Sequence, residues 1–143
     1  MSIAFRLWRW LIALLLIGYA LISLGIPVRA LLFKLQGTAE GLTGPMLDLI
    51  ASMSWLQIIA WLAALLLYLA AAVFLLRSRR QALPLSIAGA LLDIGQWASL
   101  KYGGDAYEVA FSSGQQVFDY SLFGFLAIII GSIWFLRSRS ELR

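Results

Sequence analysis

The sequence predicts an all-α fold: an integral membrane four-helix bundle with both termini on the cytoplasmic side. Three observations predict it, namely an apolar composition, four long apolar segments, and an uneven distribution of Arg and Lys between the connections. Of the 143 residues, 62% are hydrophobic and 13% are charged, whereas a soluble domain is about half apolar and about a quarter charged. A globule of this size cannot bury so much apolar surface, so we expect lipid to cover it.

Four apolar segments are each long enough to cross a hydrocarbon core about 30 Å thick as an α-helix. They run over residues 5–25, 49–76, 83–100 and 117–136. The second segment is longer than a crossing requires, so we expect it to tilt or to project beyond the core. Runs of this length favour helices over barrel strands, which alternate over about ten residues. Residues 1–143 then form a single transmembrane domain.

The first apolar segment has a second interpretation, that of a cleaved signal peptide. A basic start precedes it, and Val28, Arg29 and Ala30 follow it in a small-x-small order. Its apolar run exceeds the roughly 7–15 residues of a signal peptide, which favours a retained helix.

The basic residues indicate the orientation, because cytoplasmic connections are enriched in Lys and Arg. Eight of the eleven fall on one side of the predicted bundle: Arg6, Arg9, Arg77, Arg79, Arg80, Arg137, Arg139 and Arg143. The opposite side has Arg29, Lys34 and Lys101, diluted by several acidic residues. This distribution predicts cytoplasmic termini and explains the net charge of +4 without a nucleic-acid-binding patch.

The connections also carry structural signals. Residues 77–82 form a very short connection, so the second and third helices should be antiparallel neighbours, and Pro84 suits the first turn of a helix. In the first outer loop, Pro27 should end the first helix, and apolar residues at helical spacing over 28–36 predict a short helix in the membrane interface. In the last outer loop, Asp105 is a candidate N-cap for a short helix over 106–112.

Asp93 is the most informative residue, because it falls near the middle of the third apolar segment. A carboxyl group at the bilayer midplane costs at least about 2.5–3.5 kcal/mol unless it faces protein or a cavity. Gln96 follows it on the same polar helix face. One hypothesis makes Asp93 a proton- or ion-binding group, and the other makes Asp93 and Gln96 interhelical hydrogen-bonding residues worth about 0.6–2 kcal/mol.

Two further polar residues complete the candidate intramembrane site. Asp119 begins the fourth apolar segment, and Gln57 lies early in the second. Both are expected toward the outer side, where Lys101 could pair with Asp119. An outward-facing polar cavity is one interpretation, and ordinary interfacial polarity is the one favoured by the residues alone.

Small residues predict where helices approach closely. Candidate packing positions are Gly89, Gly124, Ala127 and Gly131. We expect them to serve packing within the chain, with self-association or docking on another membrane subunit as alternatives.

The chain contains neither Cys nor His. This excludes disulfides, iron–sulfur clusters, His-ligated haem and an ordinary zinc site. We therefore predict no metal site, no cofactor and no enzymatic activity.

By elimination, the leading functional hypothesis is a protein that acts by association, as an accessory subunit, assembly factor or self-associating scaffold of a membrane complex. Its expected partners are the lipid bilayer and other membrane subunits or further copies of itself, with no nucleic acid, and its expected location is a bacterial inner membrane. An oligomeric transporter or channel component using Asp93 is the first alternative. Binding of a lipid or quinone-like ligand between helices, in a groove lined by Trp61, Tyr68 and Trp97, is the second.

Overall fold

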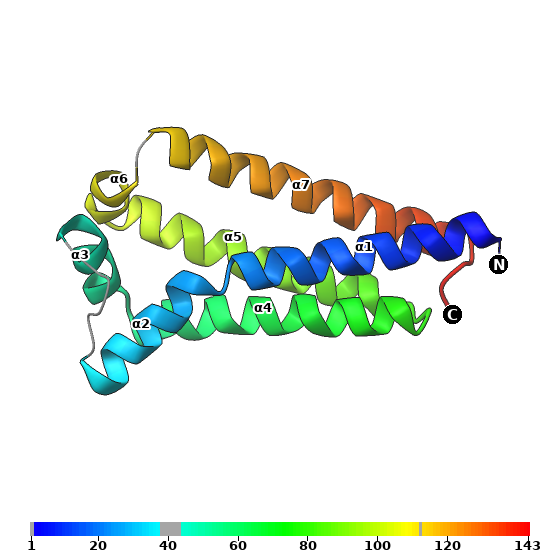
Figure 1. Cartoon of the computed structure of the whole chain (residues 1–143), viewed down its shortest axis with the longest axis horizontal. Coiled ribbons are helices and arrows are strands. Elements are labelled where there is room, and N and C mark those ends of the chain that lie inside the picture. The colour runs from blue at the N-terminus through cyan, green and yellow to red at the C-terminus, as the bar shows by residue number, and fades with distance from the viewer. Residues whose placement is uncertain (1, 38–43, 112) are drawn as a thin grey trace.

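The computed structural model describes residues 2–37, 44–111 and 113–143, and these residues are folded almost entirely into helices. The helices are α1 (Ile3–Ile22), α2 (Gly25–Gln36), α3 (Gly44–Ser52), α4 (Trp55–Leu76), α5 (Ala82–Tyr102), α6 (Ala106–Ala110) and α7 (Ser113–Ser138). Figure 1 shows α1, α4, α5 and α7 running lengthwise, with α2, α3 and α6 at one end. We call that end the loop end, and the opposite end, where both termini lie, the terminal end.

Three stretches of the described chain are long and apolar enough to cross a membrane: Ile3–Gln36, which contains α1 and α2, Trp55–Leu76 and Gly114–Ser138. The predictions of an all-helical chain and of helices long and apolar enough to span a membrane are confirmed, for three such stretches. The α5 helix is comparable to α4 in length but is not one of these stretches. Its sequence contains Asp93, Gln96 and Lys101, which lower its mean hydropathy.

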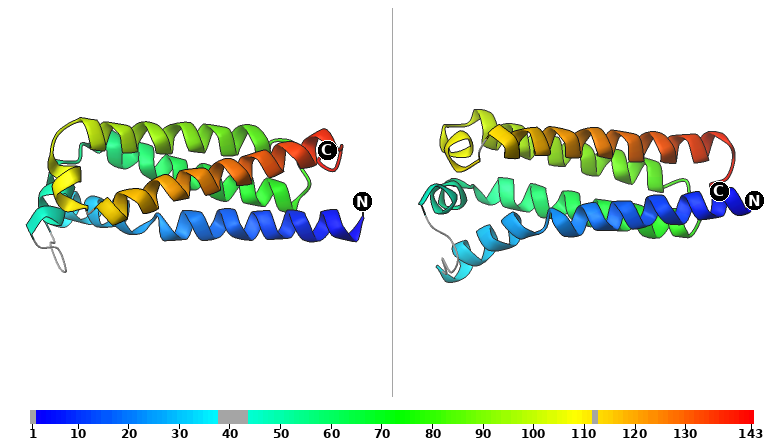
Figure 2. Two further views of the ribbon diagram at one scale, coloured as in Figure 1. Left: turned by 90° about the horizontal axis from the view of Figure 1, so that it is seen from above. Right: turned by 45° about the horizontal axis from the view of Figure 1, so that its top comes forward.

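The long helices pack as neighbours in an order that follows the chain. The predicted antiparallel contact between α4 and α5 is the most extensive in the structure, and α1 lies against α4. The α7 helix contacts both α1 and α5, and Figure 2 shows that it runs obliquely across them. At the loop end, α3 contacts α2 and α6.

The predicted helix over residues 49–76 is wrong as a single element. Its first residues belong to α3, and α4 begins only at Trp55. Ser54 and Gln57 form a capping box there: the Gln57 amide donates to Ser54 Oγ at 3.2 Å, and the Ser54 amide donates to Gln57 Oε1 at 2.9 Å. These bonds satisfy backbone groups at a helix start, so the apolar run divides into α3 at the loop end and α4, which is long and apolar enough to cross a membrane.

The other predicted helix ends are close to the observed ones. The first helix ends at Ile22, before Pro27 rather than at it, and Pro27 lies in the first turn of α2, where a missing N–H is tolerated. Pro84 occupies the equivalent place in α5, as predicted. The short helix α6 follows Asp105, whose side chain makes no cap hydrogen bond.

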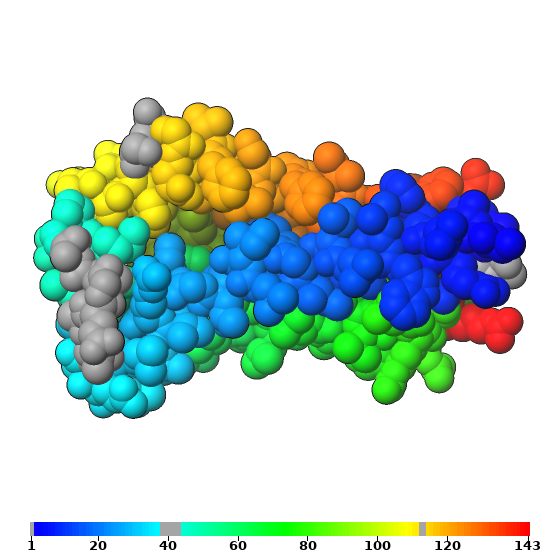
Figure 3. All heavy atoms as spheres, in the orientation of Figure 1, coloured from blue at the N-terminus to red at the C-terminus, as the bar shows by residue number. Residues whose placement is uncertain are grey.

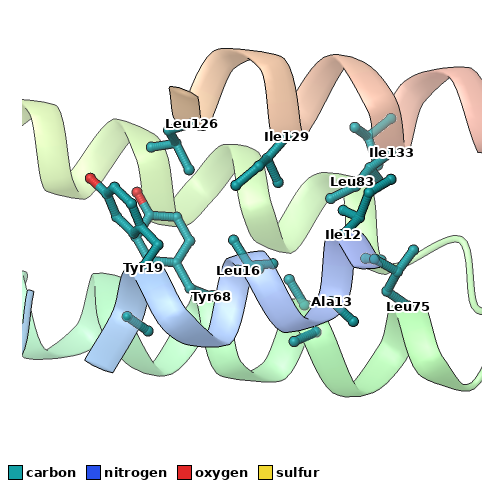
Figure 4. Packing of buried hydrophobic residues seen from close by; sticks show 14 of the residues in the cluster. Ile12, Ala13, Leu16, Tyr19, Tyr68, Leu75, Leu83, Leu126, Ile129 and Ile133 are labelled. Atoms are coloured by element: carbon teal, nitrogen blue, oxygen red, sulfur yellow. The ribbon is translucent and has the colours of Figure 1, made fainter. Parts of the chain in front are cut away.

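Apolar side chains form two clusters, one for each end of the molecule. The larger cluster draws on α1, α4, α5 and α7 toward the terminal end, and Figure 4 shows Leu126, Ile129 and Ile133 of α7 pointing toward α1, where Ile12 and Leu16 lie. The smaller cluster joins the loop-end helices to the ends of α4 and α5, around Ile50, Met53 and Ile58.

The predicted small packing residues divide between the interior and the surface. Gly89 packs inside, because a Cβ there would lie 2.9 Å from the Tyr68 ring and 3.2 Å from the Ala64 carbonyl oxygen. In contrast, Gly124 and Gly131 are exposed, and a Cβ at either would meet nothing within 4 Å. Ala127 is exposed as well, so the expectation of packing within the chain is wrong for these three residues of α7.

Candidate functional site

The centre of the candidate site is the Asp93 carboxylate, which is buried between three helices. Asp93 is near the middle of α5 and only 4% exposed. Tyr19 of α1 donates its hydroxyl to Asp93 Oδ2 at 2.8 Å, and Tyr68 of α4 donates to the same oxygen at 3.0 Å. The two phenol rings meet edge to face, with centroids 5.3 Å apart, and Figure 4 shows their hydroxyl oxygens close together. A buried carboxyl group therefore accepts two tyrosine hydrogen bonds on a single oxygen.

Gln96 lies one turn further along α5 and extends this polar group. Its side chain is 5% exposed and is within hydrogen-bonding reach of Asp93. Its Oε1 atom is buried and has no hydrogen-bond partner among the described residues. Buried polar atoms are nearly always paired, so an unpaired one calls for an explanation.

A cavity of about 330 Å³ lies against Asp93 and Gln96. Its walls come from the end of α1, from α2, α5 and α6, from the first half of α7, and from Leu49 of α3 and Trp61 of α4. Figure 3 shows the surface hollowed between α1–α2 on one side and α6–α7 on the other. Much of the lining is aromatic: Tyr19, Trp61, Trp97, Tyr107, Phe111, Phe118 and Phe123. The site is thus a mostly apolar cavity with polar groups at its base.

Trp61 contributes a second unpaired polar atom beside this cavity. Its indole Nε1 is buried and has no partner among the described residues. The cavity is therefore bordered by an unpaired acceptor on Gln96 and by a side chain with an unpaired donor.

A second polar network lies toward the loop end of the same cavity. Tyr107 of α6 donates its hydroxyl to Asp119 Oδ2 and accepts a hydrogen bond from Trp97 Nε1 at 3.1 Å. Gln115 donates to Asp119 Oδ1 at 3.3 Å. Burial, followed by the hydrogen bond to Asp119, raises the pKa of the Tyr107 hydroxyl well above its ordinary value. Tyr107 therefore stays a neutral donor, and it connects α6 to both α5 and α7.

Three of the four polar residues proposed from sequence line one cavity: Asp93, Gln96 and Asp119. The fourth, Gln57, caps α4 and donates to Ser99 Oγ at 2.7 Å, and it does not line the cavity. The suggested pairing of Lys101 with Asp119 is replaced by a hydrogen bond from Lys101 to the Tyr120 hydroxyl. Lys101 also lies 4.5 Å from the Tyr120 ring centroid.

Sequence reasoning did not identify the two tyrosines as partners of Asp93. Tyr19 lies near the end of the first apolar segment, a position typical of interfacial aromatic residues, but it is 5% exposed and faces the protein. The available signal was the position of Tyr68 well inside an apolar segment, because a buried tyrosine hydroxyl usually finds a hydrogen-bond partner.

A scan against models of protein families finds no match for this chain, and searches of curated proteins and of solved structures find none either.

Proposed function

We propose that this protein binds a small amphipathic ligand, of the lipid or quinone type, in the cavity between α1–α2 and α6–α7. The observation that carries the proposal is Gln96, whose side chain is 5% exposed, lines the cavity and has a buried Oε1 without a partner. Leaving a buried polar atom unpaired costs about 1–3 kcal/mol. A ligand with a hydrogen-bond donor at its polar end would remove that cost.

The polar complement of the cavity favours a ligand that both donates and accepts. Gln96 Oε1 accepts, whereas Trp61 Nε1 donates, and neither has a partner in the described part of the chain. A quinone or quinol headgroup and a glycerol-type lipid headgroup each offer carbonyl or hydroxyl oxygens for such contacts. Phenol and indole rings around them suit a flat or apolar body.

The size and opening of the cavity agree with this class of ligand. Its volume of about 330 Å³ lies at the lower end of the roughly 300–1,000 Å³ typical of small-molecule sites. That space suits a headgroup rather than a whole lipid. An apolar tail would leave through the hollow between α1–α2 and α7, where exposed apolar side chains such as Ile22 and Phe118 continue outward.

The proposal includes a topology of four membrane crossings, with α5 as the crossing that apolarity alone does not identify. The two polar residues at its centre, Asp93 and Gln96, are buried against protein. Its exposed side chains include Ile87, Leu91 and Ile94, so α5 presents an apolar face to its surroundings. Polar residues that face the bundle interior are compatible with a spanning helix.

The orientation that we propose has both termini in the cytoplasm, in a bacterial inner membrane. Both termini lie at one end of the molecule, and eight of the eleven Lys and Arg residues are in the segments at that end. The positive-inside rule then assigns this end to the cytoplasm.

The test of ligand binding is a fluorescence titration of the purified protein in detergent. Decylubiquinone, added in its oxidised and reduced forms, should quench tryptophan emission with saturation, because Trp61 and Trp97 line the cavity. Diacylglycerol and phosphatidylethanolamine, detected by native mass spectrometry, test the lipid class. Saturable binding of a member of either class supports the proposal, and the absence of any saturable ligand would overturn it.

Two glutamine variants localise the binding. Gln96→Leu removes the unpaired acceptor and should weaken binding by about tenfold, the equivalent of one hydrogen bond. Gln57→Leu is the matched control, because Gln57 is also a glutamine of a long helix but lies outside the cavity. Equal affinities in Gln96→Leu and Gln57→Leu would show that the ligand binds outside this cavity.

Association through α7 is a second candidate function, and a separate observation favours it. Gly124, Ala127 and Gly131 are exposed, and a Cβ added to either glycine would have no described neighbour within 4 Å outside the adjoining backbone of α7. Small residues that are not used inside the chain allow another helix to approach closely. The double variant Gly124→Leu/Gly131→Leu should therefore abolish homo-oligomers or co-purifying membrane subunits in mild detergent, whereas a wild-type protein that is strictly monomeric and partner-free would exclude this role.

A further inference from the structure

We infer a second binding site, independent of the proposed function: a phosphate-binding pocket at the terminal end, suited to the headgroup of an anionic membrane lipid. The pocket has a volume of about 570 Å³. Five arginines line it, together with one serine and one acidic residue: Arg6, Arg9, Arg77, Arg79, Arg143, Ser78 and Glu141. Three separate parts of the chain supply these residues, namely α1, the α4–α5 turn and the C-terminal segment.

Backbone hydrogen bonds hold the C-terminal segment against the α4–α5 turn and so build the pocket. The Arg143 amide donates to the Ser78 carbonyl oxygen at 2.6 Å, and the Arg80 amide donates to the Arg143 carbonyl oxygen at 2.9 Å. Arg80 Nε also donates to the Leu142 carbonyl oxygen at 3.1 Å. Leu142 itself is fully buried in the larger apolar cluster. These contacts fix the position from which the Arg143 side chain reaches the pocket.

The turn and the first helix meet at Arg9, the most buried of the five arginines. Arg9 is 9% exposed, and its Nη1 donates to Ser78 Oγ. Ser78 has a left-handed backbone, with φ of 57°, which is uncommon and unfavourable for a residue other than glycine. The fold therefore places a buried guanidinium and a constrained turn at this pocket, and membrane orientation alone requires neither feature.

The charges around the pocket call for an anion. Five guanidinium groups and one side-chain carboxylate, that of Glu141, line the pocket, so its lining carries a net positive charge that a bound anion would offset. Guanidinium groups bind phosphate oxygens in pairs through a planar fork of donors. Because the arginines come from three parts of the chain, several of them can contact one phosphate from different sides.

The surroundings favour a lipid as the source of the phosphate over a soluble ion. Trp8 and Trp10 flank Arg9 in sequence and are 44% and 49% exposed. Exposed tryptophans are typical of the headgroup level of a membrane. Further along α1, Leu11 and Leu14 are exposed apolar residues along which acyl chains could lie. Basic pockets of this kind at a membrane surface suit anionic headgroups.

The experiment measures lipid retention by the full-length protein in mild detergent, using native mass spectrometry. Phosphatidylglycerol should be retained in preference to phosphatidylcholine of the same chain length. Arg6→Gln/Arg77→Gln, which changes two exposed side chains, should reduce phosphatidylglycerol retention at least about tenfold, since hydrogen bonds to charged groups are the stronger ones. Arg9→Gln should have a comparable effect, and the double variant keeps the test valid should Arg9→Gln fail to fold.

Arg139→Gln is the matched control for Arg9→Gln, because each variant removes one positive charge. Arg139 carries the same charge at the same end but does not line the pocket, and it stacks on Phe135 at 5.3 Å. It should retain phosphatidylglycerol within about twofold of the unmodified protein. Equal losses in Arg139→Gln and Arg6→Gln/Arg77→Gln would mean a general charge effect and would overturn the pocket.

Competition with inorganic phosphate tests whether the pocket binds the phosphate of a lipid headgroup or a free phosphate ion. Phosphate at low millimolar concentration should leave bound phosphatidylglycerol in place if the site takes a lipid. Binding of inorganic phosphate without any preference for phosphatidylglycerol would overturn the lipid assignment. Equal retention of both lipids with no phosphate binding would overturn the site altogether.

Discussion

The two ends of the molecule use the same four long helices but pack them differently. Toward the terminal end, Leu126, Ile129, Ile133 and Leu136 of α7 are all buried. Toward the loop end, Val117, Phe118 and Tyr120 of the same helix are 64%, 50% and 49% exposed. A single helix therefore closes one half of the structure and leaves the other half hollow.

The difference follows from the side chains of α7. Its second half has apolar residues at helical spacing, whereas its first half contains Gln115, Gln116 and Asp119. Asp119 accepts hydrogen bonds from Tyr107 and Gln115, and a hydrogen-bonded polar side chain does not pack against the apolar surfaces of other helices as Ile129 or Ile133 does. Polar side chains at the start of α7 thus set the place where close packing ends, and the cavity begins there.

The largest expected effect comes from truncating the same side chain at each end. Leu16→Ala removes a fully buried side chain from the larger cluster and should lower the free energy of unfolding by about 2–5 kcal/mol. Leu122→Ala lies at the cavity wall, where contacts exist on one side only, and should cost about 1–2 kcal/mol. Reversible unfolding in mixed micelles with increasing dodecyl sulfate, followed by circular dichroism, measures both.

Leu14→Ala is the control for this pair, because Leu14 is on α1 and is 59% exposed. It should change the free energy of unfolding by less than about 0.5 kcal/mol. Equal losses for Leu16→Ala and Leu122→Ala would show that the cavity closes in solution and would remove the contrast between the two ends.

The tyrosines that bind Asp93 test the boundary between the two regions. Tyr68 is fully buried, whereas Tyr19 lines the cavity. Tyr68→Phe should therefore cost about 1–3 kcal/mol of unfolding free energy, because no other group can reach the vacated site. Tyr19→Phe should cost about 1 kcal/mol or less, because water or ligand in the cavity can replace the lost donor.

The same unfolding titration measures this pair, with Tyr102→Phe as the control, since Tyr102 is 75% exposed. A larger loss in Tyr19→Phe than in Tyr68→Phe would contradict the assignment of Tyr19 to the open side of Asp93.

Much of the helical architecture could be predicted from composition and periodicity, because long apolar runs in a small chain have few other solutions. The break between α3 and α4 was missed although Ser54 and Gln57 stand in the S-x-x-Q spacing of a capping box. The surrounding residues are apolar on both sides, so a prediction from hydropathy alone runs one helix through the capping box.

The candidate site was only partly predictable, for a geometric reason. The cost of burying a carboxyl group identified Asp93, and helical spacing identified Gln96 beside it. The donors to Asp93 come from residues 74 and 25 positions away in sequence, so they depend on how α1, α4 and α5 are placed around one another. The cavity likewise results from the oblique path of α7, which no periodicity within one helix specifies.

The smallest effects come from adding one methyl group to two glycines, and they distinguish interior packing from open surface. In Gly89→Ala, the new Cβ would lie 2.9 Å from the Tyr68 ring and 3.2 Å from the Ala64 carbonyl oxygen. The overpacking should exceed the gain in helix propensity and give a net loss of about 1 kcal/mol. Gly131→Ala meets nothing within 4 Å and should gain about 0.5–1 kcal/mol in the monomer.

The glycine pair also tests association. Stability is measured in dilute micelles, where the protein is monomeric, and oligomer content is measured in concentrated bilayers, where copies can associate. If α7 docks on a second helix through Gly131, then Gly131→Ala should weaken that contact while it stabilises the monomer. The free energy of unfolding measured in dilute micelles would then rise, and the oligomer content measured by cross-linking in concentrated bilayers would fall. An unchanged oligomer content would leave Gly131 as a lipid-facing residue, whereas stabilisation by Gly89→Ala would contradict the close α4–α5 contact on which the position of Asp93 depends.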